Sequence, residues 1–172
     1  KAQGFTWHNI SSHQARQWMG EIGASLIPTF EGGLLDANEK HRFIGRRLVE
    51  RLQDMVECLV EWMPQYGLEP TYVELGFGLG DNALPGWALP LDKERELILR
   101  GRLDRVDLVR SPDGSRSYAV VVDYKSSPKS LEELKLQHGL QLQLPAYLLV
   151  LQHLSQSGDL KVPPIEPVGG FY

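Results

Sequence analysis

The sequence predicts an α/β fold in which a mixed sheet is flanked by helices. Two observations support this fold class. Up to residue 66, apolar side chains recur with the spacing of helices, whereas after Gly67 they gather in short runs typical of strands. With 172 residues, the chain can form one domain with a sizeable core. We expect residues 1–66 to be a helical segment that packs on a core formed by residues 67–172.

The N-terminal segment is expected to contain two helices. Ser11 or Ser12 caps the first helix. The second begins at Asp36, where Glu39 three residues later resembles a capping box, and it runs to about Tyr66. Helical spacing predicts that one face of the second helix belongs to the core, and this face carries Ile44, Leu48, Leu52, Met55, Leu59 and Met63.

The remaining elements are predicted from their periods and from the turn residues between them. A polar loop interrupted by proline and glycine follows the first strand, and a second loop covers 127–139. Pro145 is tolerated in a helix if it lies in the first turn, where its missing N–H is not needed. The predicted order is three strands at 70–78, 97–110 and 117–126, a helix at 140–154 and a last strand at 165–172.

The turn between the second and third strands sets their register. Asp113 and Gly114 are a strong signal for a two-residue hairpin loop. If they form that loop, Asp104 and Asp123 lie directly opposite each other, with Cβ atoms about 4.5–5.5 Å apart. Like charges in this position destabilise a sheet, so packing alone would not keep them there. A loop one residue longer or shorter would separate the two aspartates onto opposite faces.

A divalent cation would remove the conflict between these carboxylates, because Mg²⁺ prefers oxygen ligands. Lys125 lies two positions beyond Asp123 on the same face, opposite Arg102, where its ammonium group could meet a phosphate or orient a water molecule. This combination is typical of phosphodiester cleavage. The alternative is that Asp104 and Asp123 are unrelated carboxylates that pair with arginines.

Composition limits the class of protein. The net charge of −4 argues against a free-standing, high-affinity DNA-binding protein. The single cysteine, Cys58, excludes an internal disulfide, and no apolar run is long enough to span a membrane. We therefore expect a cytoplasmic protein without a membrane partner, and Lys1 in place of methionine suggests a fragment of a longer polypeptide. A local basic surface is predicted from Lys93, Arg95, Arg100, Arg102, Arg105 and Arg110.

Three motifs, taken in order, resemble one branch of a nuclease superfamily. "GRLDRVD" at 101–107, "VVDYKSS" at 121–127 and "LQLQLPAYLLVLQ" at 140–152 are similar to the RecB-type branch of the PD-(D/E)XK nucleases. Within this branch they look most like the AddB-type C-terminal nuclease domains of bacterial helicase–nucleases. The resemblance implies a restriction-endonuclease-like fold and a metal-dependent DNA exonuclease domain that processes double-strand DNA ends for recombinational repair. A non-catalytic DNA-end-binding or scaffold module with the same fold is the alternative.

The resemblance also implies roles for individual residues. Asp104 and Asp123 match the metal-binding aspartates, and Lys125 matches the catalytic lysine. Gln143 and Tyr147 match a Q-x-x-x-Y motif that lines the DNA-facing side of the site. Four residues apart on a helix, these two side chains project from one face. Tyr147 could alternatively be a core residue.

Further positions are implied outside these motifs. Glu74 matches an acidic position that adds a third catalytic carboxylate or holds a water, Arg102 is expected to contact DNA, and the backbone carbonyl of Tyr124 could reach a metal. The branch normally takes a metal-binding histidine from a G-x-x-x-H helix. Gly4 and His8 match these letters, but no helix-forming run precedes them, so we expect the true histidine upstream of the first residue.

The implied cofactor is Mg²⁺ or Mn²⁺, and the implied partners are DNA and the helicase subunit of an AddAB-like complex. AddB-type proteins commonly carry an iron–sulfur cluster held by cysteines that flank the nuclease region. Cys58 cannot hold a cluster alone. Either the cluster's cysteines lie elsewhere in the full-length protein, outside this fragment, or this relative lacks the cluster.

Overall fold

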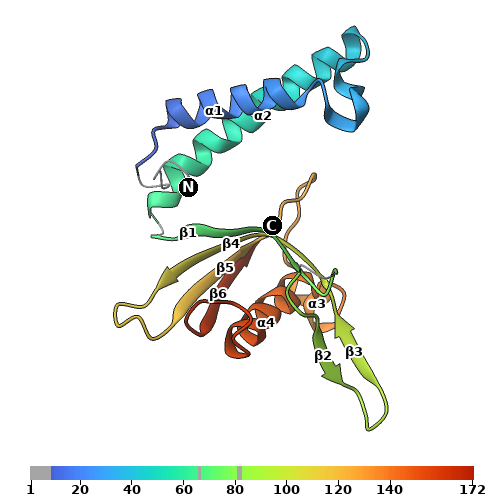
Figure 1. Ribbon diagram of the computed structural model, residues 1–172, viewed down its shortest axis with the longest axis vertical. Helices are drawn as coiled ribbons and strands as arrows, with labels where there is room; N and C mark the ends of the chain where they lie inside the picture. The colour runs from blue at the N-terminus through green and yellow to red at the C-terminus, as the bar shows by residue number, and fades with distance from the viewer. Residues whose placement is uncertain (1–8, 66, 81–82) are drawn as a thin grey trace. The chain divides into compact units, whose positions relative to one another are not determined.

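The computed structural model describes residues 9–65, 67–80 and 83–172 (Figure 1). The chain divides at Gly67 into two compact units, a helical unit and a unit built on a sheet. How the helical segment packs on the core stays a prediction. Within the described ranges, no helix is both long and apolar enough to cross a membrane.

The helical unit consists mainly of two helices that lie side by side, α1 (Ser12–Leu26) and α2 (Glu39–Trp62) (Figure 1). Ser11 caps α1. Its side chain accepts the N–H of Gln14, and the Gln14 side chain accepts the N–H of Ser11 in return. This capping box satisfies two backbone donors of the first turn and confirms the first of the two predicted caps.

The second helix begins later than predicted. Its N-cap is Asn38, whose side chain accepts the N–H of His41, whereas Asp36 belongs to a short 3₁₀ turn. The helix therefore takes its cap from the amide immediately before its first residue, and not from the aspartate. The 3₁₀ turns next to α2 and in the connection between the helices are Phe30–Gly32, Leu34–Asp36 and Met63–Gln65.

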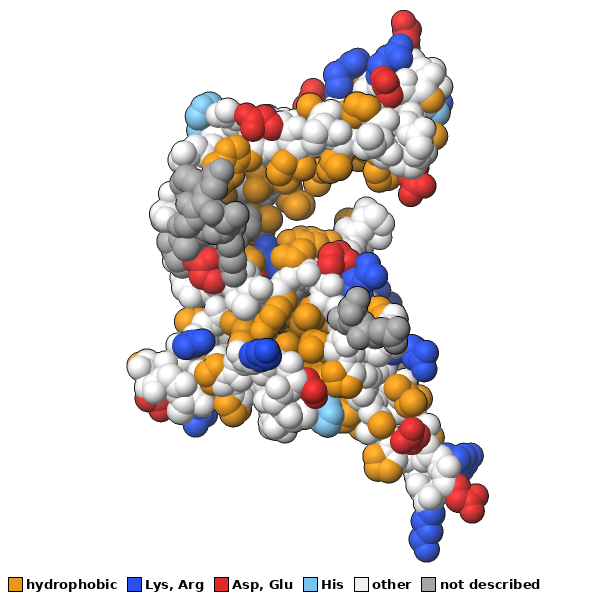
Figure 2. All heavy atoms as spheres, viewed as in Figure 1, with side chains coloured by type: hydrophobic (Ala, Val, Ile, Leu, Met, Phe, Trp, Pro, Cys, Tyr) orange, Lys and Arg blue, Asp and Glu red, His pale blue; other side chains and the backbone are white. Residues whose placement is uncertain are grey.

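Within the helical unit, the apolar face predicted for α2 is uncovered for most of its length, and its packing on the second unit stays a prediction. Met63 is buried and Leu59 half-buried, but the other four residues of this face are each at least 39% exposed, namely Ile44, Leu48, Leu52 and Met55. Instead, α1 covers the neighbouring face of α2, where Gly45 is buried and where a Cβ atom on Gly23 would lie 2.5 Å from Val49. Figure 2 shows hydrophobic side chains gathered along one side of the helical unit.

The second unit is built on a mixed sheet with the strand order β1-β4-β5-β6. The first three are antiparallel neighbours, and β6 runs parallel to β5. Helix α4 covers one face of this sheet (Figure 1). The predicted fold class is confirmed. The bounds are β1 Glu69–Phe77, β4 Gly101–Arg110, β5 Ser117–Val122, β6 Ile165–Phe171, α3 Glu133–Gln137 and α4 Gln143–Gln156.

Along the chain, a small separate hairpin follows β1 and precedes β4. It pairs β2 (Trp87–Pro90) with β3 (Glu96–Leu99), inside a stretch whose first part was predicted to be a polar loop. The single strand predicted at 97–110 is therefore two strands, which are separated at Arg100. Proline and glycine interrupt this stretch, and with strands of only four residues each, the apolar pattern was too short to predict the hairpin.

The core of the second unit lies between the sheet and α4. Apolar side chains of both layers are almost completely shielded from water, and Pro145 lies in the first turn of α4 as predicted. Leu144, the residue next to Gln143, is buried in this core and anchors the first turn of α4. The core cluster includes Phe77, Leu103, Val106, Val121, Leu144, Val150, Leu151 and Leu154.

Candidate active site

The β4–β5 hairpin has the register that the sequence predicts, with Arg105 opposite Val122. Its loop is longer than the predicted two residues. The N–H of Ser111 donates to the carbonyl of Arg116 at 3.0 Å, so four residues lie between the closing pair. They are centred on the predicted Asp-Gly pair, and Gly114 has a φ of 71°. Compared with the predicted loop, one residue is added on each side of the Asp-Gly pair. Residues that were predicted to be opposite each other therefore stay opposite, and each side chain keeps its face of the sheet.

The two aspartates follow at the end of this hairpin. The pairing between the strands stops at Val122, just before Asp123. The N–H of Asp123 donates to the carbonyl of Phe171, and the N–H of Tyr124 donates to Oδ2 of Asp104 at 2.8 Å. The carboxylate of Asp104 thus takes the place of a ladder hydrogen bond and holds the chain directly after Asp123.

The sheet is irregular at this point. Leu103 and Val106 both belong to the core, although two residues, Asp104 and Arg105, separate them instead of one. On β1, Glu74 has a φ of 53°, which is uncommon for a residue other than glycine. Strained backbone of this kind is frequent at functional sites. The irregularity breaks the alternation of faces, and hydrophobic periodicity could not reveal it.

A cluster of polar side chains forms around Asp123, which is buried. The Nζ atom of Lys125 lies 2.5 Å from Oδ2 of Asp123 and donates to Oε1 of Gln143 at 3.0 Å. The Nε2 atom of Gln143 donates to the hydroxyl of Tyr147 at 3.1 Å and to Oδ1 of Asp123 at 3.4 Å. The structure therefore brings four of the predicted residues into one hydrogen-bonded group, with Asp104 next to it.

The charge of Lys125 is set by its neighbours. Contact with the carboxylate of Asp123 raises the pKa of Lys125 above its ordinary value; burial opposes this rise, and the charges of Asp104 and Tyr147 add smaller contributions to it. The lysine is therefore an ammonium ion at neutral pH. Oδ2 of Asp123 is buried and has the Lys125 ammonium as its ion-pair partner, without a hydrogen bond of ordinary geometry.

The donor set suits a hard divalent cation in part. Oδ2 of Asp123 is a buried carboxylate oxygen without a hydrogen bond, and the carboxylate of Asp104 lies at the same end of the hairpin. Among the described residues, no third acidic, histidine or cysteine side chain joins them in a group that could hold a metal ion. Mg²⁺ often binds through one or two carboxylates and keeps several waters, so two aspartates are a sufficient set. Gly4 and His8 lie outside the described residues.

Glu74 and Arg102 lie apart from this group. Nη1 of Arg102 is 3.1 Å from Oε2 of Glu74, and both side chains are 59% exposed. Together they line a shallow hollow of about 540 Å³ beside β1. The expectation that Arg102 faces Lys125 is wrong, because β5 ends before Lys125 and Arg102 lies opposite Gly76 of β1.

Sequence reasoning missed a buried ion pair next to the site. Arg105 and Asp107 are 3% and 2% exposed, so the expectation of an exposed basic surface is wrong for Arg105. Nε of Arg105 donates to Oδ1 of Asp107 at 2.7 Å, Nη2 to Oδ2 at 2.6 Å, and Nη1 to the hydroxyl of Tyr124 at 3.1 Å. The available signal was the spacing, because opposite charges two apart on a strand share a face.

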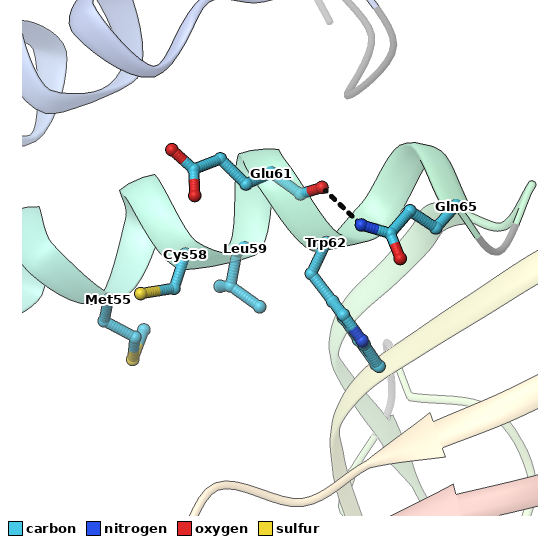
Figure 3. A pocket seen from close by; sticks show the side chains of 6 residues that line it. All are labelled: Met55, Cys58, Leu59, Glu61, Trp62 and Gln65. Carbon is cyan, nitrogen blue, oxygen red and sulfur yellow. Dashed lines mark hydrogen bonds between the residues drawn. The ribbon is translucent and has the colours of Figure 1, made fainter.

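A second hollow, of about 470 Å³, lies in the helical unit. In Figure 3, Met55, Leu59 and Trp62 project to one side of α2 and Glu61 to the other. Cys58 lines it and has a free thiol. The lining is mostly apolar and holds a single carboxylate, so it does not offer the pair that phosphodiester cleavage needs.

Comparison with known proteins gives two findings. Residues 15–172 match the model of the PD-(D/E)XK nuclease superfamily. The chain is also 32% identical over 170 residues to an ATP-dependent helicase/deoxyribonuclease subunit of Moorella thermoacetica, and 33% identical over 157 residues to the protein of the same name from Desulforamulus reducens. These alignments cover 99% and 91% of this chain but only 14% and 13% of the relatives, so the chain spans a small part of their length.

Proposed function

The chain belongs to the PD-(D/E)XK nuclease superfamily, and from this premise we propose that it is a DNA nuclease domain that cleaves phosphodiester bonds with a divalent metal ion. The observation that carries the proposal is the group formed by Asp123, Lys125 and Gln143 next to Asp104. Two carboxylates with a cation beside them can bind a metal and stabilise the charge that develops on a phosphate.

Asp104 and Asp123 would hold the metal ion, Mg²⁺ or Mn²⁺. Oδ2 of Asp123 is buried beside the Lys125 ammonium, at the end of the hairpin where Asp104 also lies, and this placement supports the role. When bound, such an ion lowers the pKa of a coordinated water and stabilises negative charge on the phosphate. The backbone carbonyl of Tyr124 remains the proposed third protein ligand.

Lys125 serves in this proposal as a cation and not as a base. A lysine side chain of ordinary pKa is already an ammonium ion at neutral pH, so Lys125 is assigned the role of a cation. It stabilises the developing charge on a phosphate oxygen and orients the water. Gln143 accepts from Lys125 through Oε1 and donates to Asp123 through Nε2, so a single amide sets the spacing of both charged groups.

DNA contacts are proposed for Tyr147, for Gln143 and for Arg102. The hydroxyl of Tyr147 meets the amide of Gln143, which connects it to the charged groups. The ion pair of Arg102 with Glu74 is exposed, and such pairs contribute little to stability, so a DNA phosphate could replace the carboxylate. A catalytic role for Glu74 stays a prediction, since its partner in the structure is Arg102.

The wider role is proposed from the relatives, whose names describe helicase/deoxyribonuclease subunits. We infer a helicase partner in an AddAB-like complex, double-strand DNA ends as the site of action and a place in recombinational repair. A motor partner that delivers DNA would explain why a domain with a net charge of −4 need not capture it unaided. A cytoplasmic location is part of this proposal, and an iron–sulfur cluster belongs to it only if further cysteines are present elsewhere in the full-length protein.

A second candidate function is a non-catalytic DNA-end-binding or scaffold module. One observation favours it, because the described residues supply two acidic side chains at the site and no third acidic, histidine or cysteine side chain. Such a module would bind DNA ends but would not turn them over. The two candidates differ in whether DNA is degraded when Mg²⁺ is present.

Degradation of linear single-stranded DNA by the full-length protein tests the proposal. We expect Mg²⁺-dependent degradation that falls at least about 100-fold in Asp104→Asn and in Asp123→Asn, because each change removes a carboxylate while keeping its shape. Asp113→Asn is the matched control on the same hairpin and should leave the rate unchanged. DNA binding without degradation by the unmodified protein would instead support the scaffold module.

A further inference from the structure

A charged pair is buried in the middle of β4, beside the proposed active site. Arg105 and Asp107 are joined by two hydrogen bonds, and their side chains are only 4% and 2% exposed. Removing two charges from water is costly, and apolar residues of similar size often stabilise a protein equally well. Stability alone therefore does not account for this pair.

The guanidinium of Arg105 reaches from this pair to the segment that carries the catalytic residues. Its Nη1 atom donates to the hydroxyl of Tyr124 at 3.1 Å. Tyr124 stands between Asp123 and Lys125 in the chain, and its N–H donates to Asp104 at 2.8 Å. One residue is thus tied through its side chain to the buried pair and through its backbone to a proposed metal ligand.

The segment after β5 depends on such contacts for its position. The paired strand ends at Val122, so the β4–β5 ladder no longer holds the next three residues. Tyr124 itself is 45% exposed, which means that core packing holds its ring only in part. The hydroxyl contact to Arg105 therefore fixes a ring that core packing holds only in part, and it ties the residue between Asp123 and Lys125 to β4.

We propose that Arg105 and Asp107 are positioning residues that act through Tyr124 and set the placement of Asp123 and Lys125 relative to Asp104. The effect on DNA cleavage rests on the proposed nuclease function, whereas the contacts of Arg105 with Asp107 and Tyr124 do not depend on it. Asp107 occupies Nε and Nη2 of the guanidinium and so aims Nη1 at the tyrosine. Lysine could not serve in place of Arg105, because a single ammonium lacks this planar fork.

Tyr124→Phe is the decisive variant, because it removes one hydroxyl from a partly exposed ring and leaves the buried pair intact. Arg105→Lys is the second variant, which keeps the charge but loses the fork. Tyr118→Phe is the matched control, because Tyr118 lies on β5 towards the far end of the hairpin, opposite Val109.

The first readout is the hydrogen-exchange rate of the residue 124 amide, measured by NMR on the metal-free protein. We expect exchange several-fold to about tenfold faster in Tyr124→Phe, the effect of one hydrogen bond, and faster still in Arg105→Lys. Tyr118→Phe should not change it. An unchanged rate in Tyr124→Phe overturns the inference whatever the enzyme does.

The second readout is the kinetics of DNA degradation. Tyr124→Phe should lower kcat by a similar factor and leave the KM for DNA unchanged, because a positioning defect acts on the reacting groups and not on strand binding. An equal kcat for Tyr124→Phe and the unmodified protein contradicts the inference. If the exchange rate rises but even the unmodified protein degrades no DNA, the positioning role stands and the nuclease proposal fails.

Discussion

The left-handed backbone at Glu74 predicts an unusual response to glycine. Its φ of 53° brings a Cβ atom close to the following carbonyl, which costs residues other than glycine about 1–2 kcal/mol. We compare Glu74→Gly with Glu74→Ala, since both lose the same carboxylate and the same ion pair with Arg102. Glu74→Gly should be the more stable of the two by about 1 kcal/mol. For a domain of this size the difference corresponds to about 2–4 °C in Tm.

The neighbouring residue on β1 provides the control. Val73 is 67% exposed and does not have a positive φ, so glycine brings it no relief from strain. There, Val73→Gly should be less stable than Val73→Ala by about 0.5–1 kcal/mol, because glycine loses more conformational freedom in a strand. Urea denaturation of the four variants measures both differences. If glycine is the less stable choice at position 74 as well, the strain at Glu74 is not present in solution.

Two further predictions concern packing and charge. Gly23→Ala should destabilise the helical unit by about 1–3 kcal/mol, since the new Cβ would lie 2.5 Å from Val49. Gly20→Ala should cost less, because the new Cβ meets only the side-chain amide of Gln53, which donates to the Arg16 carbonyl and is the only group that has to move. Urea denaturation followed by circular dichroism distinguishes the two variants, and equal losses would contradict the close packing of α1 on α2. The raised pKa of Lys125 stabilises the fold at pH values below its ordinary 10.5 and ceases to do so as the pH rises through the higher folded value. The stability difference between the unmodified protein and Lys125→Met should therefore shrink above about pH 10.5 in titrations of the unfolding free energy, and a constant difference would show that the Asp123 contact is absent.

Local signals explain what could be predicted from the sequence. The Asp-Gly pair specifies a hairpin without reference to the rest of the chain, so the register that brings Asp104 and Asp123 to one end followed from it. Gln143 and Tyr147 are one helical turn apart, and their common side of α4 required only that spacing. The mixed sheet followed from the order of the elements.

Contacts distant in sequence explain what was missed. The period of α2 identifies an apolar face, but it does not indicate the contact with α1, which depends on the close approach of Gly23 to Val49. At Asp104 the alternation of side chains between the two faces of the sheet is broken. This requires two neighbouring strands to distort together, which the sequence of one strand does not indicate. Burial of Arg105 depends on the fold that surrounds it, and no property of the residue itself indicates it.

The central claim is that Asp104 and Asp123 bind one divalent ion, with Lys125 beside it. Titration calorimetry with Mn²⁺ tests this claim most directly, because it needs neither DNA nor turnover. We predict one site in the unmodified protein that is lost in both Asp104→Asn and Asp123→Asn and kept in Asp113→Asn. Unchanged Mn²⁺ binding in either of the first two variants would contradict the account.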